Sequence, residues 1–200
     1  MARLNISRII PIVLVLIIVA VAIAALVSLT RAVFFSGSSQ TASTIDVGRE
    51  ALLDTKADRS VRMTVRGSIV ADEEFRSYQI TIAPANRSLT TYTGYLDKKV
   101  DQVILGNNTP AYEQFVYAAD RANIMKGTEL SGDKNDTRGI CATGRVYQFE
   151  VLKADKVIKN LWTSTCRGSL GSLDANIDQL TNLFVVQLPT ADVLIRKISL

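Results

Sequence analysis

The stretch that decides the fold reads Val61-Arg-Met-Thr-Val-Arg66, followed after a short segment by Phe75-Arg-Ser-Tyr-Gln-Ile-Thr-Ile82. In both segments apolar residues alternate with polar ones, which is the pattern of a β-strand with one buried face. A turn at Ala71–Glu74 would place Val65 opposite Ile80, so that the two apolar faces coincide. A slip of one residue would destroy this match, and we therefore predict an antiparallel hairpin here.

The sequence on either side of this hairpin predicts further short strands and helices, all separated by turn residues. The expected elements are a weak helix over Ile45–Ala57, a hairpin over Ser88–Leu96 and Val100–Leu105, a helix between Thr109 and Gly127, a hairpin over Ile140–Leu152 and Val157–Cys166, a helix from Ser172 to Pro189, and a strand over Val193–Ile198. Strands joined mainly by short turns indicate an α+β domain, in which two amphipathic helices pack on one face of an antiparallel sheet.

The first of the two amphipathic helices has clear start and stop signals. Thr109 can cap it, Pro110 suits the first helical position, and Gly127 suits a left-handed stop. Between these signals, apolar residues recur at helical spacing and form a stripe that would pack against the sheet. The stripe consists of Tyr112, Phe115, Ala119, Ala122 and Met125.

A long apolar segment precedes the domain. Residues 9–35 contain one charged residue, Arg31, and a helix of about 20 such residues crosses a membrane. We therefore expect a transmembrane anchor here, with residues 1–8 in the cytoplasm because Arg3 and Arg8 precede it. A cleaved signal peptide is the alternative, although its apolar stretch is usually only about 7–15 residues long.

The chain after the apolar segment is expected to lie outside the cell membrane. Residues 36–44, with the sequence SGSSQTAST, have the composition of a flexible tether. Residues 45–200 then form one extracytoplasmic domain, which is large enough to bury a substantial core. The location would make the protein single-pass and exposed at the cell surface.

The net charge of +4 does not indicate nucleic-acid binding. All 19 acidic residues follow Phe35, whereas three of the 23 basic residues, namely Arg3, Arg8 and Arg31, flank or lie in the apolar segment. The exterior part therefore has 20 basic and 19 acidic residues, and its basic residues are scattered along the chain. Phosphate recognition needs a basic stripe, so we expect no nucleic-acid partner.

The two cysteines, Cys141 and Cys166, fall close to each other at the base of the third hairpin. Alternation along its strands would place them on an aromatic face together with Phe149 and Trp162. A structural disulfide is the leading interpretation, because an exterior location permits the bond to persist. Two reduced core cysteines are the main alternative, and the absence of CxxC spacing argues against a redox-active pair.

Histidine is absent from the chain, and its absence excludes many catalytic classes. Catalytic triads, HExxH metalloproteases and the usual zinc centres all need histidine, so we predict no catalytic, metal or cofactor-binding residues. Two weaker patterns are consistent with an enzyme, which is therefore the alternative. Ser131 and Lys134 have the spacing of a Ser-x-x-Lys motif, and carboxylates gather at Asp72–Glu74.

Three stretches carry a resemblance to a known group of proteins. They are Phe75-Arg-Ser-Tyr-Gln-Ile80, Pro110-Ala-Tyr-Glu-Gln-Phe115 and Leu161-Trp-Thr-Ser-Thr-Cys166. In these stretches the chain resembles the ectodomains of uncharacterised single-pass membrane-anchored proteins of reduced-genome bacteria. The resemblance would cover nearly all of the chain after the tether, and it implies a cell-surface location without implying an activity or a site.

The sequence therefore favours a non-enzymatic binding or assembly module of the cell envelope, tethered to the membrane and in contact with a protein or envelope partner. Tyr92 and Tyr95 are the candidate partner contacts, because aromatic residues are enriched at interfaces. They are also ordinary strand residues, so packing within the sheet is an equal alternative for them. A histidine-free envelope hydrolase or transferase, using carboxylates or a Ser/Lys pair, remains the alternative function.

Overall fold

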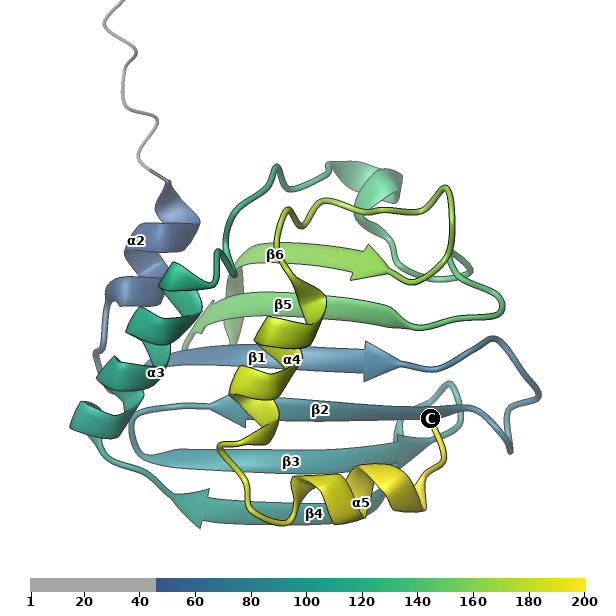
Figure 1. Cartoon of the computed structure of the whole chain (residues 1–200), viewed down its shortest axis with the longest axis horizontal. Coiled ribbons are helices and arrows are strands. Elements are labelled where there is room, and N and C mark those ends of the chain that lie inside the picture. Colours follow the sequence, from purple (N-terminus) through teal and green to yellow (C-terminus); the bar gives the residue numbers. More distant parts are fainter. Residues whose placement is uncertain (1–45) are drawn as a thin grey trace, which may run out of the picture. The chain divides into compact units, whose positions relative to one another are not determined.

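The computed structural model describes residues 46–200, and the predicted anchor and tether lie outside this part of the chain. Six antiparallel strands form one sheet in the order β4-β3-β2-β1-β5-β6. Within residues 46–200, no helix combines the length and the apolar character that a membrane crossing requires. The predicted α+β class, an antiparallel sheet with helices, is confirmed (Figure 1).

The elements follow one another in a simple order along the chain. They are α2 (Val47–Leu53), β1 (Arg59–Arg66), β2 (Arg76–Ile82), β3 (Asn86–Thr93), β4 (Lys98–Gly106), α3 (Thr109–Arg121), the 3₁₀ turn η1 (Gly132–Asn135), β5 (Val146–Lys153), β6 (Lys156–Ser164), α4 (Ile177–Val185) and α5 (Ala191–Lys197). Strands β1 to β4 are consecutive in the chain and each pairs with the next, as β5 does with β6. The two groups join where β5 pairs with β1.

The predicted β1–β2 hairpin forms, but its register differs by two residues from the expectation. Val65 lies opposite Tyr78 rather than Ile80. The connection is longer than the expected four-residue turn, because β1 ends at Arg66 and β2 begins only at Arg76. A shift of two residues preserves which side chains share a face, so the apolar faces still coincide.

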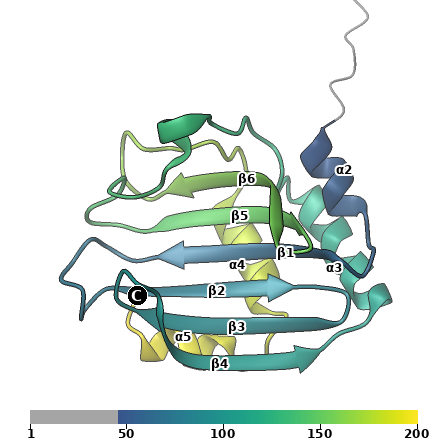
Figure 2. The ribbon, with the colours of Figure 1, turned by 180° about the vertical axis from the view of Figure 1, so that it is seen from behind.

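The helices cover one face of the sheet and enclose the main core there. Figures 1 and 2 show α3, α4 and α5 over the same face, and α2 contacts α3, β1, β5 and β6. Phe184 of α4 packs edge-on against Phe115 of α3, with ring centroids 5.1 Å apart, and lies 6.0 Å from the ring of Phe149 on β5. These three rings join two helices to the centre of the sheet.

All five side chains of the predicted stripe are buried, and Tyr112, Phe115 and Ala119 lie within α3, whereas Ala122 and Met125 follow its end. The ends of the helix differ from the expectation. The side chain of Asn108, rather than that of Thr109, accepts the capping hydrogen bond from the backbone N–H of Ala111 at 3.0 Å. The helix ends at Arg121, ahead of Gly127, and Asn123 takes the left-handed conformation shortly after it, with φ of 62°.

Two predictions near the C-terminal part of the domain are wrong. The second amphipathic helix, α4, begins at Ile177 with Asn176 as its cap, because the hydroxyl of Ser172 is occupied by the backbone N–H of Trp162. The expected strand over Val193–Ile198 is the helix α5. Ala191 at its start and Ile198, its C-cap, are buried seven residues apart, which is a helical spacing, whereas the alternation that suggested a strand leaves Val193 exposed.

The other face of the sheet is polar. Gln148, Thr64, Gln79, Thr90 and Gln102 form a row across five neighbouring strands. The amide of Gln79 donates to the hydroxyl of Thr64 at 3.2 Å, and the amide of Gln102 donates to that of Thr90 at 3.1 Å. Side-chain hydrogen bonds between strands therefore accompany the backbone ladder on this face.

The two edges of the sheet differ in how their backbone is covered. On β6, the carboxylate of Glu129 accepts from the N–H of Asn160 at 3.2 Å, and the hydroxyl of Ser172 accepts from the N–H of Trp162 at 3.1 Å. On β4, no backbone hydrogen bond reaches the outer side from any part of residues 46–200. That strand instead carries Lys98 and Lys99 next to a β-bulge.

Candidate binding site

An apolar pocket of about 180 Å³ lies at the end of the sheet where β1 ends and β2 begins. In Figure 1 the β1–β2 connection lies at the opposite end of the strands from α2, with which the described chain begins. We call this pocket the distal pocket. Its apolar wall consists of Ile69, Phe75, Tyr95, Ile140, Cys141 and Val146, and its charged lining consists of Arg66 and Arg138.

Tyr95 forms one wall of the distal pocket and joins two chain connections. Its ring stacks on that of Phe75, with centroids 4.1 Å apart. Its hydroxyl donates to the carbonyl of Val70 at 2.8 Å and accepts from the N–H of the same residue at 3.1 Å. The carboxylate of Asp72 accepts from the N–H of Tyr95 at 2.7 Å. These contacts join the β1–β2 connection and the β3–β4 turn into one wall of the pocket.

The disulfide supports the opposite wall of the pocket. The predicted Cys141–Cys166 bond is confirmed, with Cα atoms 5.5 Å apart. Gly144 passes so close to the bond that a side chain there would meet both sulfur atoms, as well as the hydroxyl of Thr165. Loop residues Thr137–Cys141 line the pocket, so the bond holds in place the segment that closes it.

The expected location of the cysteines on the Phe149 face is wrong. Cys141 packs in a small cluster with Val146 and Trp162, separate from the main core. Trp162 lies opposite Gln148, whereas Phe149 lies opposite Leu161, so Trp162 and Phe149 occupy different faces of the sheet. The expectation failed for two reasons. A register shift between Val151 and Leu152 changes which residues of β5 and β6 lie opposite each other. In addition, β5 begins at Val146 rather than Ile140, so strand alternation cannot be extended back to Cys141.

The two arginines give the distal pocket a cationic rim. Arg138 forms an exposed ion pair with Asp136, Nε to Oδ2 at 2.8 Å, and this contact lowers the pKa of Asp136 to about 2. Arg66 lies farther from its carboxylate, because its Nη2 is 3.5 Å from Asp97 Oδ2. Arg66 is therefore the less neutralised of the two cations.

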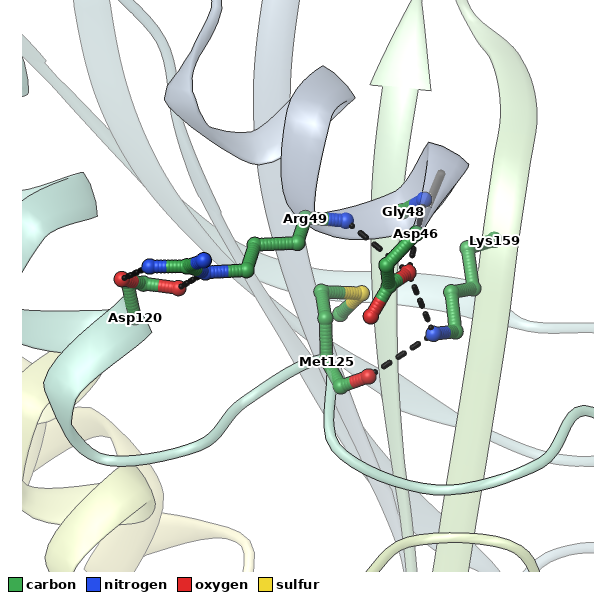
Figure 3. Close-up of polar contacts among 6 residues, drawn as sticks. All are labelled: Asp46, Gly48, Arg49, Asp120, Met125 and Lys159. Carbon is green, nitrogen blue, oxygen red and sulfur yellow. Dashed lines mark hydrogen bonds and ion pairs between the residues drawn. The ribbon is translucent and has the colours of Figure 1, made fainter. Parts of the chain in front are cut away.

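A second, polar cleft of about 250 Å³ lies beside α2, and its charges are already paired. Lys159 donates to the carboxylate of Asp46 at 2.9 Å and to the carbonyl of Met125 at 2.8 Å (Figure 3). Arg49 forms two hydrogen bonds to Asp120, at 2.7 and 2.9 Å. These contacts fasten the first turn of α2 to β6 and α3, which is a structural role.

Asp46 also caps α2, because its Oδ1 accepts from the N–H groups of Gly48 and Arg49 at 3.1 and 3.2 Å. Burial raises the pKa of Asp46, but the hydrogen bond from Lys159 and those from the backbone outweigh burial and leave the pKa below its usual value. A carboxylate with a lowered pKa in the folded state stabilises the fold above its unfolded pKa, and this contribution is lost on acidification through the folded pKa.

We therefore expect Asp46→Ala to reduce the free energy of unfolding at pH 7 by about 1–2 kcal/mol, since it removes the cap and leaves Lys159 without its carboxylate partner. The difference from the wild type should shrink as the pH falls below about 4, where the unfolded carboxyl becomes protonated. Denaturant unfolding at pH 7 and pH 3 measures both effects. Glu74→Gln, an exposed carboxylate in the β1–β2 connection, is the control, and equal losses in both variants would contradict the assigned role.

The residues of the alternative enzymatic hypothesis are exposed, and they lie in the β1–β2 connection and at η1. Ser131 and Lys134 are both exposed at η1, and among residues 46–200 no hydrogen bond joins their side chains. Asp72 is engaged with the N–H of Tyr95. Within the described residues, no three potential ligand side chains gather in a way that could hold a metal ion.

The two predicted contact residues, Tyr92 and Tyr95, lie in different surroundings. Tyr95 lines the distal pocket, whereas Tyr92 lies half-buried in β3, outside the pocket wall. Sequence reasoning missed Arg66, Arg138 and Ile140 as site residues. Arg66 ends a strand, Arg138 belongs to a loop with a polar composition, and Ile140 was expected in a strand. No family model matches the chain, and the search of curated proteins found no similar sequence.

Proposed function

We propose that this chain is a membrane-tethered binding or assembly module of the cell envelope, and that the distal pocket contacts its protein or envelope partner. One observation carries the proposal: an apolar pocket opens at the end of the sheet opposite α2. Two residues of its lining, Ile69 and Tyr95, are exposed, as are the residues that follow them in the chain, Val70 and Leu96, and Leu96 is 94% exposed. Exposed apolar groups gathered beside a pocket are typical of interaction sites.

The membrane part of the proposal rests on the sequence. Residues 9–35 have the length and composition of a single transmembrane span, and Arg3 and Arg8 favour a cytoplasmic N-terminus. The Cys141–Cys166 disulfide supports an extracytoplasmic location for the domain, because such bonds persist in oxidising compartments. The distal pocket lies at the end of the sheet opposite α2, the first element of the described domain.

A crosslinking experiment on intact cells tests both parts of the proposal. A membrane-impermeant, amine-reactive crosslinker should couple the full-length protein to one partner. Ile69→Gln should lower the captured amount at least about fivefold, because it removes an apolar wall of the pocket without adding a charge. Ile104→Gln is the matched control, since Ile104 is an exposed isoleucine on β4 outside the pocket, and its capture should equal that of the wild type.

Two results would contradict the proposal. Equal capture by the wild type and Ile69→Gln would remove the distal pocket from partner binding. Reaction of the crosslinker with the domain only after cell lysis would overturn the extracytoplasmic location. Gel migration and mass spectrometry of the crosslinked band measure both outcomes.

A further inference from the structure

The size of the distal pocket limits what can enter it. Its volume of about 180 Å³ is below the roughly 300–1,000 Å³ of sites that enclose a cofactor or a drug-sized molecule. It is close to that of apolar cavities of about 150 Å³, which hold a single benzene ring. The pocket therefore fits one apolar side chain, such as phenylalanine or leucine, rather than a whole small molecule.

The charges around the pocket favour an anion beside that apolar group. Both charged side chains in its lining are arginines, and among residues 46–200 no carboxylate contributes to the lining. Arg66 has its carboxylate neighbour, Asp97, at 3.5 Å, so guanidinium donors remain for a second acceptor. Guanidinium groups bind carboxylates through paired hydrogen bonds, which makes a carboxylate on the ligand the matching partner.

The surface next to the pocket extends this site in one direction. A wider, open depression of about 650 Å³ shares Arg138 and Ile140 with the distal pocket. Its lining includes Leu170, which is exposed, and Trp162, together with Lys134 and the carboxylates of Asp133 and Asp136, of which Asp136 is paired with Arg138. A ligand that filled the pocket and continued over Arg138 would therefore meet a second, contiguous surface.

We propose that the partner binds through an extended acidic peptide segment that places one apolar side chain in the distal pocket and a carboxylate against Arg66. The segment continues over Arg138 and Ile140 into the depression beside Leu170. This inference rests on the proposed function and specifies the partner's chemistry. A side-chain-sized pocket favours a peptide over a lipid, because an acyl chain would need a longer apolar channel than the pocket provides.

The experiment uses the full-length protein in nanodiscs of zwitterionic lipid and three blocked, fluorescent pentapeptides. Their sequences are Glu-Glu-Phe-Glu-Glu, Lys-Lys-Phe-Lys-Lys and Glu-Glu-Ala-Glu-Glu, and binding is measured by fluorescence anisotropy. The acidic phenylalanine peptide should bind at least about tenfold more tightly than the other two, since only this peptide matches both the pocket and its charge.

Charge variants test the role of Arg66 directly. Arg66→Gln should weaken binding of the acidic phenylalanine peptide about fivefold or more, and Arg66→Glu should also improve binding of the basic peptide. Lys156→Glu is the control, because it reverses an exposed charge at the first residue of β6, which does not line the pocket. Thermal unfolding of each variant verifies that it is folded, and Arg66→Gln keeps the test valid if Arg66→Glu does not fold.

The outcomes separate this inference from the proposed function. Equal affinity for the acidic and basic peptides would overturn the inference, while pocket-dependent capture on cells would leave the proposed function intact. Binding to phosphatidylglycerol vesicles that depends on Arg66, without binding of the phenylalanine peptide, would replace the peptide by a lipid surface. Loss of pocket dependence in the capture experiment would instead overturn the proposed function itself.

Discussion

Replacing Phe184 by alanine is expected to lower the free energy of unfolding by about 3–5 kcal/mol, the usual cost of removing a buried phenylalanine. Phe184 is fully buried, and its ring contacts those of Phe115 and Phe149. It therefore joins α4 to α3 and to the sheet, and alanine would leave a cavity where these three elements meet. Most folded domains have only about 5–15 kcal/mol of stability, so this loss should bring the domain close to unfolding.

The measurement is pulse proteolysis of the full-length protein across a urea series. Val186→Ala is the matched control, because Val186 lies just after α4 and its side chain is exposed. The control should change the free energy of unfolding by less than about 0.5 kcal/mol. A similar shift of the urea midpoint in both variants would show that the packing of α4 on the sheet contributes little to stability.

Removing the Cys141–Cys166 disulfide is expected to cost about 3 kcal/mol. The bond closes a loop with a sequence separation of 25, and the chain-entropy model assigns about this value to such a loop. The loss should also affect binding, because Cys141 and the loop before it line the distal pocket. We therefore expect the Cys141→Ser/Cys166→Ser variant to melt at a lower temperature and to capture less partner than the wild type.

Reduction of the wild type provides an independent measurement of the same bond. A phosphine reductant should lower the unfolding temperature of the wild type to nearly that of the double serine variant, and it should leave the variant unchanged. Mass spectrometry of non-reduced peptides from cell-derived protein would identify the bond directly. Free thiols at both positions in that sample would contradict the disulfide and the oxidising location inferred from it.

Local patterns in the sequence predicted the parts of the fold that depend on neighbouring residues. Alternation in β1 and β2 and the apolar stripe of α3 identify the buried faces, because burial of apolar side chains selects the face regardless of the exact pairing. The pairing itself depends on the connection between strands. Tyr95, which lies in the β3–β4 turn, forms hydrogen bonds to Val70 and Asp72 in the connection between β1 and β2. Because these contacts come from another hairpin, the local sequence pattern could not reveal the two-residue shift of the register.

The candidate site was less predictable because its walls come from separate parts of the chain. Tyr95 was identified from its residue type and its place in a hairpin, but Arg66 was read only as an outward strand residue. Arg138 belongs to a loop whose polar composition says nothing about its position. The disulfide, which brings this loop to the sheet, could be predicted from the spacing of the two cysteines, whereas the face on which it lies depends on where β5 begins.

The difference between the two edges of the sheet affects how copies of the protein associate at high concentration. Side chains of the described residues accept from the N–H groups of Asn160 and Trp162 on the outer side of β6, so a neighbouring copy finds this row of backbone groups interrupted. Among residues 46–200 nothing covers the outer backbone of β4 in this way, and a strand of this kind is a template for edge-to-edge pairing and aggregation. Lys98, Lys99 and the adjacent bulge counter this tendency, because two approaching copies would bring their lysines together and the bulge distorts the ladder. The solubility of densely packed copies should therefore depend on these lysines keeping their charge.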